Sequence, residues 1–162
     1  MVKQYVKNQK VNESNWLIGE NIFMNKYNAK AIRSMSNPGS AYYLSPKVKD
    51  KQVGHMKDYV HLPLDEEHDN GGVHIYSGIP NRAFYLLATA LGGYSWEIAG
   101  KIWIKTLFDK RLTPQSDFLQ FAIANIETAQ TMYGSQIANL TQQSWEAVGL
   151  YFNRQQSLSA HK

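Results

Sequence analysis

Two charged side chains that could take part in acid–base chemistry lie close together near the middle of the sequence. Asp69 and His74 are separated by a segment that contains the turn formers Asn70, Gly71 and Gly72. Because adjacent glycines let the backbone turn sharply, the Asp69 carboxylate is expected to reach the His74 imidazole. A carboxylate there favours the imidazolium, which can stabilise an oxyanion in a hydrolytic transition state. The alternative is a structural histidine bonded to the backbone, and the residues alone leave both readings open.

A third candidate is Arg33, which occurs in the segment 31–38 with the sequence AIRSMSNP. An arginine next to apolar residues and just before a turn can present its planar guanidinium to a carbonyl or a carboxylate. A structural ion pair or a solvated arginine is the alternative interpretation. Arg33 is therefore a candidate substrate-binding residue whose role depends on its neighbours.

The elements that must position these residues differ between two regions of what we expect to be a single domain, residues 1–162. Residues 1–78 contain many turn formers and weak periodicity, and only residues 2–9 look helical there. Residues 79–152 show helical spacing of apolar side chains and predict a compact helical bundle, followed by a polar tail at 153–162. The sequence thus predicts a mainly α fold with the candidate site on its loop-rich segment.

Four helices are expected in the bundle, each bounded by residues that commonly start or end a helix. The first is apolar nearly all round, so it should be buried. The expected boundaries are Pro80 in the first turn and Gly92 at the end of the first helix, Ser95 as the cap of the second, Ser116-Asp117 and Gly134 at the start and end of the third, and Ser135 as the cap of the fourth.

Composition and charge argue against several classes of protein. The chain has no cysteine, which removes disulfides, thiolate metal sites and cysteine nucleophiles. Its net charge is +4, but the lysines are scattered through polar loops without a dense stripe, so no nucleic-acid partner is expected. No run of 18 apolar residues occurs, so no membrane span is expected, and the first residues lack the apolar stretch of a signal peptide. The compartment stays undetermined.

Several segments resemble the carboxy-terminal half of the thermolysin-like neutral zinc endopeptidases, the bacillolysin and protealysin type. Residues 15–20 (NWLIGE) resemble the family's D-W-x-I-G-E, and residues 32–38 (IRSMSNP) its L-R-S-M-S-[DN]-P. Residues 69–78 (DNGGVHIYSG) resemble D-N-G-G-V-H-I-N-S-G, the signature around the family's catalytic histidine. The segments GKIW, LTP and WEAVG, which start at 100, 112 and 145, follow in the family's order. The resemblance runs from about residue 10 to residue 152.

The resemblance implies a role for each matching residue. His74 would be the catalytic histidine that hydrogen-bonds the tetrahedral oxyanion, and Asp69 the aspartate that holds it charged and oriented. Arg33 would bind the substrate carbonyl, with Ile32 in the apolar wall of the primed-side pocket. Such a pocket favours a large apolar residue directly after the scissile bond of a peptide or protein substrate.

The zinc site of the resembled family is absent from this sequence. That site needs H-E-x-x-H on a helix, because residues four apart present both imidazoles on one face. The five histidines, His55, His61, His68, His74 and His161, are separated by six, seven, six and 87 residues. None of them can form the pair, so the chain is expected to bind no zinc and to be inactive without an amino-terminal half that carries the motif.

The sequence also differs from the family pattern at two smaller points, a calcium site and the pocket beside the histidine. Where several family members carry an acidic calcium cluster, this chain has Asn15, Leu17, Glu20 and Asn21, which argues against strong calcium binding. Tyr76 replaces the usual asparagine of the signature and is expected to place a bulky ring beside His74.

Two functions from different classes follow. The first is the substrate-binding and oxyanion-stabilising half of a zinc metalloendopeptidase, which acts together with the missing amino-terminal half. The second is a non-catalytic peptide- or protein-binding module, or a remnant of such a protease, and Tyr76 with the weakened acidic cluster favours it slightly. In either case the surface that would face the missing half is expected to be exposed and partly apolar, which predicts self-association.

Overall fold

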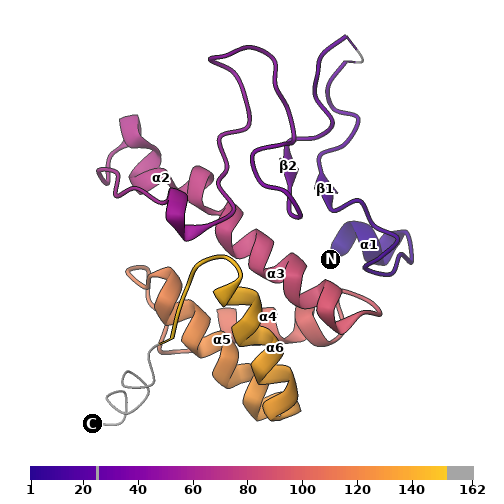
Figure 1. The fold of residues 1–162 in the computed structure, drawn as a ribbon, viewed down its shortest axis with the longest axis vertical. Coiled ribbons are helices and arrows are strands. Elements are labelled where there is room, and N and C mark those ends of the chain that lie inside the picture. Colours follow the sequence, from indigo (N-terminus) through magenta and orange to yellow (C-terminus); the bar gives the residue numbers. More distant parts are fainter. Residues whose placement is uncertain (25, 153–162) are drawn as a thin grey trace.

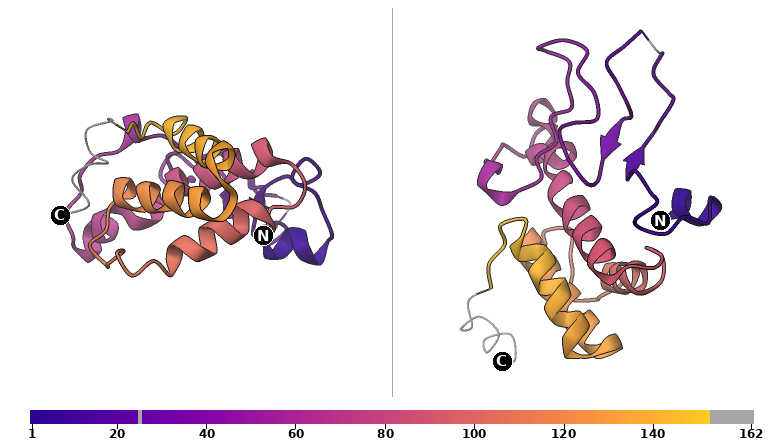
Figure 2. Two further views of the ribbon diagram at one scale, coloured as in Figure 1. Left: turned by 90° about the horizontal axis from the view of Figure 1, so that it is seen from below. Right: turned by 45° about the vertical axis from the view of Figure 1, so that its right-hand side comes forward.

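The computed structural model describes residues 1–24 and 26–152, in a loop-rich part and a helical part (Figure 1). The loop-rich part comes first in the chain and lies along one side of the long helix in the centre of the view, with loops that extend away from that helix. Two of the later helices pack along that helix, and a third packs against those two (Figure 2). The polar tail predicted at 153–162 lies outside the described residues. Apart from this tail, the mainly α fold is confirmed.

The loop-rich part contains little regular structure. Helix α1 covers Val2–Val6, and strands β1 (Leu17–Ile18) and β2 (Arg33–Ser34) pair antiparallel, with Leu17 opposite Ser34 and Ile18 opposite Arg33. Two single 3₁₀ turns follow, η1 at Met56–Asp58 and η2 at Glu66–His68. The pairing of β1 with β2 matters for function because it fixes the backbone that carries Arg33.

Between residues 69 and 152, the helical part contains five helices. They are α2 (Asp69–Tyr76), α3 (Gly78–Leu91), α4 (Ile98–Leu107), α5 (Phe118–Tyr133) and α6 (Ser135–Glu146). Helix α3 packs against both α4 and α6, and α5 packs against the same two helices. Residues of α3 that face its neighbours are buried, as its nearly uniform apolar sequence predicts.

The centre of the bundle is aromatic, as the tryptophan content suggests. The rings of Trp103 (α4) and Trp145 (α6) stack with centroids 5.6 Å apart, and Phe121 (α5) meets Trp145 edge to face at 5.9 Å. The buried Asn125 side chain accepts a hydrogen bond from Trp145 Nε1 (3.1 Å) and donates one to Thr106 Oγ1 (2.9 Å). A fully satisfied polar group of this kind fixes the relative position of α4, α5 and α6.

Several predicted helix boundaries are confirmed and others are wrong. Helix α3 ends at Gly92, whose φ of 71° only glycine adopts easily, and α5 starts after Asp117 and ends at Gly134 as expected. The helical part begins with α2 at Asp69, one short helix before the predicted residue 79, and helix α1 stops at Val6 instead of residue 9. Residues 69–72 have positive φ angles, so the start of α2 carries no regular helical pattern of apolar side chains.

Two predicted helix caps are also wrong. Helix α4 starts at Ile98, and the Ser95 hydroxyl instead donates to the Gln4 side chain, which ties the amino-terminal segment to the bundle. Ser135 is the first residue of α6 and not its cap. None of the helices within residues 1–24 and 26–152 is long and apolar enough to span a membrane.

Candidate functional site

Asp69 and His74 are joined at the start of α2. The Asp69 carboxylate accepts two hydrogen bonds from His74, one from the ring at Nδ1 (2.5 Å) and one from the backbone N–H (2.8 Å). Two hydrogen bonds to one carboxylate fix both the ring and the backbone of the histidine. The side chain of His74 is nevertheless 77% exposed, because nothing covers its other face. The predicted contact between these two residues is therefore present in the structure.

The backbone conformation of residues 69–72 explains why two glycines lie between Asp69 and His74. Residues 69–72 all have positive φ, between 48° and 81°, and form a left-handed turn that brings Asp69 back over the following helix. Gly72 has an added constraint, because a Cβ there would lie 2.4 Å from the ring of Tyr76. A residue with a side chain at position 72 would therefore disturb the turn that aligns Asp69 with His74.

The protonation state of Asp69 follows from this geometry. The hydrogen bond from the His74 side chain is the main cause that holds the pKa of Asp69 below its usual 3.8. Asp69 is then ionised near neutral pH and can only accept hydrogen bonds, so the proton between the two groups belongs to His74 Nδ1. The Nε2 atom of His74 is left free to contact a ligand.

Arg33 is held near this pair by a buried carboxylate. Its Nη1 donates to the carbonyl of Ile32 (2.8 Å) and lies 3.9 Å from Asp50 Oδ1. The side chain of Asp50 is completely buried, which is tolerated because it accepts several backbone hydrogen bonds. These come from the N–H groups of Gly39 (3.1 Å), Ala41 (3.2 Å) and Gln52 (3.1 Å). Asp50 thus both folds the loop around it and orients the arginine.

Gln52 links this loop to the helix that carries the histidine. Its side-chain amide donates to the carbonyl of His74 (3.1 Å) and to Ser77 Oγ (2.8 Å). Neither Asp50 nor Gln52 was singled out from the sequence. The signal that could have found Asp50 is its position between Lys49 and Lys51, since a lone acidic residue among lysines in a loop can be a buried partner.

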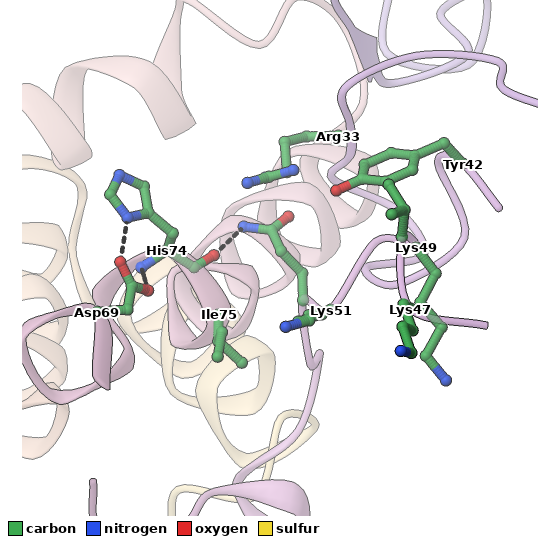
Figure 3. A pocket seen from close by; sticks show the side chains of 10 residues that line it. Arg33, Tyr42, Lys47, Lys49, Lys51, Asp69, His74 and Ile75 are labelled. Carbon is green, nitrogen blue, oxygen red and sulfur yellow. Dashed lines mark hydrogen bonds and ion pairs between the residues drawn. The ribbon is translucent and has the colours of Figure 1, made fainter. Parts of the chain in front are cut away.

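These side chains meet in an open pocket of about 290 Å³. Asp69, His74 and Ile75 lie on one side, Tyr42, Lys47 and Lys49 on the other, and the Arg33 guanidinium lies between them (Figure 3). Val48, Lys51 and Gln52 complete the lining. Three of the four predicted site residues, Arg33, Asp69 and His74, are therefore brought together around one pocket.

Ile32 is the predicted site residue that does not line this pocket. Its side chain is 40% exposed and packs over Gly19, where a Cβ would lie 2.7 Å from Ile32 Cγ1. Ile32 thus presents an apolar surface next to Arg33 but outside the pocket itself, and its role in an apolar wall stays a prediction.

The prediction that Tyr76 places its ring beside His74 is wrong. Its ring is 6% exposed and lies in the core of the protein, with its centroid 4.4 Å from that of Tyr59, and its hydroxyl accepts the N–H of Val60 (3.2 Å). Residues 74 and 76 project differently because they lie two positions apart on a helix. The tyrosine therefore leaves the surroundings of His74 open.

The position of the family's calcium cluster is filled by a lysine. Lys3 Nζ donates to Asn15 Oδ1 (2.8 Å), to the carbonyl of Leu17 (3.0 Å) and to the Glu20 carboxylate. The hydrogen bond from Lys3 is the main cause that lowers the pKa of Glu20. The ammonium supplies positive charge among these oxygens where a calcium ion would otherwise do so, and weak calcium binding stays a prediction.

Comparisons with known proteins decide the family. The model of the thermolysin metallopeptidase alpha-helical domain matches residues 1–150. This chain belongs to that family. It is 47% identical over 150 residues to an extracellular metalloprotease of Pectobacterium carotovorum subsp. carotovorum. The aligned residues cover 93% of this chain and 42% of that protein. It is 38% identical over 135 residues to bacillolysin of Bacillus amyloliquefaciens, which covers 83% of this chain and 23% of that protein.

A solved structure has the same fold. The precursor of protealysin, a metalloproteinase from Serratia proteamaculans, matches with a TM-score of 0.86 and 48% identity over 93% of this chain and 45% of that chain. The chain thus spans less than half the length of these relatives and corresponds to the carboxy-terminal helical domain of thermolysin-like peptidases. The predicted family and fold are confirmed.

Thermolysin-like metallopeptidases depend on zinc, but the residues of this chain do not fit that metal. Among residues 1–24 and 26–152, no three histidine, aspartate or glutamate side chains come close enough together to hold a metal ion. The spacing of the five histidines also excludes H-E-x-x-H anywhere in the sequence. What the thermolysin-type domain contributes here is a pocket with an oriented histidine and an arginine.

Proposed function

We propose that this chain is the substrate-binding and oxyanion-stabilising half of a thermolysin-like zinc endopeptidase that hydrolyses peptide bonds. The observation that carries the proposal is the double hydrogen bond of Asp69 to His74 at a pocket that Arg33 also lines. A purely structural histidine would have no need of an exposed, oriented ring at a pocket.

His74 would stabilise the negative charge that develops on the carbonyl oxygen of the scissile bond. With Nδ1–H bound to Asp69, the imidazolium donates from Nε2 to that oxygen. Asp69 compensates the positive charge of the ring and prevents it from rotating. Because both hydrogen bonds exist before substrate arrives, no reorganisation is needed during the reaction.

Arg33 and Ile32 would bind the substrate. The Arg33 guanidinium keeps donors beyond the one used on the Ile32 carbonyl, and its side chain is partly exposed at the pocket. These donors suit a carbonyl of the peptide on the primed side. The exposed Ile32 beside it supports a preference for a large apolar residue directly after the scissile bond.

The chain alone would be inactive in this account, because the zinc ligands and the general-base glutamate must come from a segment that carries H-E-x-x-H. The partner is accordingly a zinc-binding amino-terminal half, and the substrate is a peptide or protein. The relatives' printed names, which include an extracellular metalloprotease and a bacillolysin, support this chemistry.

The proposal is tested by adding an amino-terminal half with H-E-x-x-H and zinc to this chain. A peptide with Phe or Leu after the scissile bond should be cleaved by the mixture and by neither half alone. A matched peptide with Asp in that place should be cleaved more slowly. No cleavage above that of the separate halves, from a complex shown to form by gel filtration, would contradict the proposal.

The alternative is a non-catalytic binding module or remnant, which Tyr76 and the weakened acidic cluster favour slightly in the sequence. Tyr76 lies in the core and so gives it no support, whereas the acidic cluster is reduced to Glu20, paired with Lys3. It predicts peptide binding that does not depend on zinc and no cleavage in the mixture, so the same experiment separates the two functions.

A further inference from the structure

The pocket beside His74 has a wall of lysines that the roles proposed above do not use. Lys47, Lys49 and Lys51 line it together with Arg33, whereas Asp69 is the one carboxylate among the lining residues, and it is bound to His74. All three lysines are exposed. Within residues 1–24 and 26–152, none of them forms an ion pair with an acidic side chain.

The backbone around Asp50 holds these lysines in place. Asp50 points inward and binds three backbone N–H groups, so its neighbours Lys49 and Lys51 are directed outward. The residue before Asp50 also pairs with Tyr43 in an antiparallel bridge, and the turn at residues 45–48 carries Lys47. The positive wall is therefore attached to an ordered loop and not to a free tail.

The charge on the pocket is unbalanced as a result. Asp50 partly compensates Arg33 from the buried side, but its side chain is fully covered and does not reach the lysines' exposed ends. Like charges that share one pocket repel one another, and an anion that enters it relieves this repulsion. Lys47 and Lys49 lie across the pocket from His74, and Lys51 lies between them and Ile75 (Figure 3), so that the three ammonium groups border the part of the pocket away from the His74 ring.

We infer that this wall binds a carboxylate of the substrate peptide, on the primed side and beyond the apolar residue that follows the scissile bond. The inference rests on the proposed function in that a peptide occupies the pocket. The carboxylate could belong to an Asp or Glu side chain or to the carboxyl terminus of a short peptide, and both sources present the same group to Lys47, Lys49 and Lys51. The hydroxyl of Tyr42, on the same side, is a further donor.

The test measures binding to the full 162-residue chain and needs neither zinc nor cleavage. Fluorescein-labelled peptides of sequence Gly-Phe-Glu-Ala amide and Gly-Phe-Gln-Ala amide are titrated, and the dissociation constants are compared by fluorescence polarisation. We expect the Glu peptide to bind about five-fold more tightly at low ionic strength, and the difference to shrink at about 1 M NaCl. Equal affinities at low ionic strength would overturn the inference.

Variants assign the effect to the wall. The triple variant Lys47→Gln, Lys49→Gln, Lys51→Gln should lose the preference for Glu, and the corresponding triple Arg variant should retain it. Lys101→Gln, at an exposed lysine of α4 away from the pocket, should leave it unchanged. A preference that survives the triple Gln variant, with its thermal midpoint unaltered, would overturn the assignment to these lysines.

A further pair of peptides, Gly-Phe-Ala as the free acid and as the amide, distinguishes the two sources of the carboxylate. If the free acid binds more tightly than the amide, and the triple Gln variant removes this difference in affinity, the carboxyl terminus is a ligand of the same wall. The outcome is independent of the cleavage experiment. Selective binding without cleavage in the mixture contradicts the proposed function alone, whereas cleavage without a preference for the carboxylate contradicts this inference alone.

Discussion

At the scale of single residues, the site depends on one carboxylate that binds one histidine twice. The contact between Asp69 and His74 was predictable because both residues lie on one short turn, five positions apart. Lys3, Asp50 and Gln52 were not predictable in this way. Most of their partners lie 11 or more residues away along the chain, and spacing alone does not show such contacts.

The pKa of Asp69 gives a first prediction. Replacement of His74 by Ala removes the main cause of its lowered pKa, so the pKa of Asp69 should rise toward its ordinary value of 3.8. The stability that the pair contributes is present above that ordinary pKa and is lost as the pH falls through the lowered one. Carboxyl chemical shifts of Asp69 across an acid titration measure the change.

A matched pair elsewhere serves as the control for this titration. His68 binds Asp65 at 2.7 Å and lies outside the pocket. His68→Ala should leave the pKa of Asp69 where it is. An unchanged Asp69 titration in His74→Ala would show that the hydrogen bond is not the cause.

Lys3 gives a second prediction, about calcium. Because its ammonium lies among the oxygens of Asn15, Leu17 and Glu20, the thermal midpoint should not respond to added calcium or to a chelator. Lys3→Met should destabilise the protein by about 1 kcal/mol, since it removes the charged donor that these oxygens share. Lys10→Met is the control at an exposed lysine. A midpoint that rises with calcium in the unmodified chain would be inconsistent with this view.

At the scale of elements, helix boundaries were predictable where a side chain caps its own helix. Asp117 accepts the N–H of Gln120 (2.8 Å), and the Gln120 side chain accepts the N–H of Asp117 (3.0 Å), which is a complete capping box. Ser95 has the right residue type for a cap but binds Gln4, far away in the sequence. The left-handed start of α2 was missed because no periodic pattern reports positive φ angles.

The capping box gives a third prediction. Asp117→Ala should lower the free energy of unfolding by about 0.5–2 kcal/mol, because it leaves the first N–H groups of α5 without a partner. Asp117→Asn keeps a good cap and should have little effect. Urea denaturation of the three proteins measures the difference. An equal loss of unfolding free energy in both variants would mean that the negative charge of Asp117, and not its capping hydrogen bond, stabilises the helix.

At the scale of the whole molecule, the loop-rich part exposes large apolar side chains. Among them are Ile18, Ile22, Met24, Tyr43 and Val48, each at least 48% exposed. A covered interface with a second half would explain such residues, and without a cover they tend to associate. The family, the helical bundle and this exposure were all expected from the sequence. A pocket beside Arg33 was also expected, but its lining by Tyr42 and three lysines was not, since its walls come from four separated segments.

This exposure gives a fourth prediction. The isolated chain should self-associate at moderate concentration, and an amino-terminal half with H-E-x-x-H should suppress the association by covering the same surface. Static light scattering over a concentration series measures both effects. A monomer at every concentration would contradict the expectation.

The central claim, that His74 stabilises the transition state in a complete enzyme, is tested most directly by kinetics of the reconstituted protein. We predict that His74→Ala lowers kcat by about 100- to 1,000-fold with little change in KM, because the lost hydrogen bond forms fully only in the transition state. His68→Ala should leave kcat unchanged. Equal kcat values for His74→Ala and the unmodified protein would contradict the account.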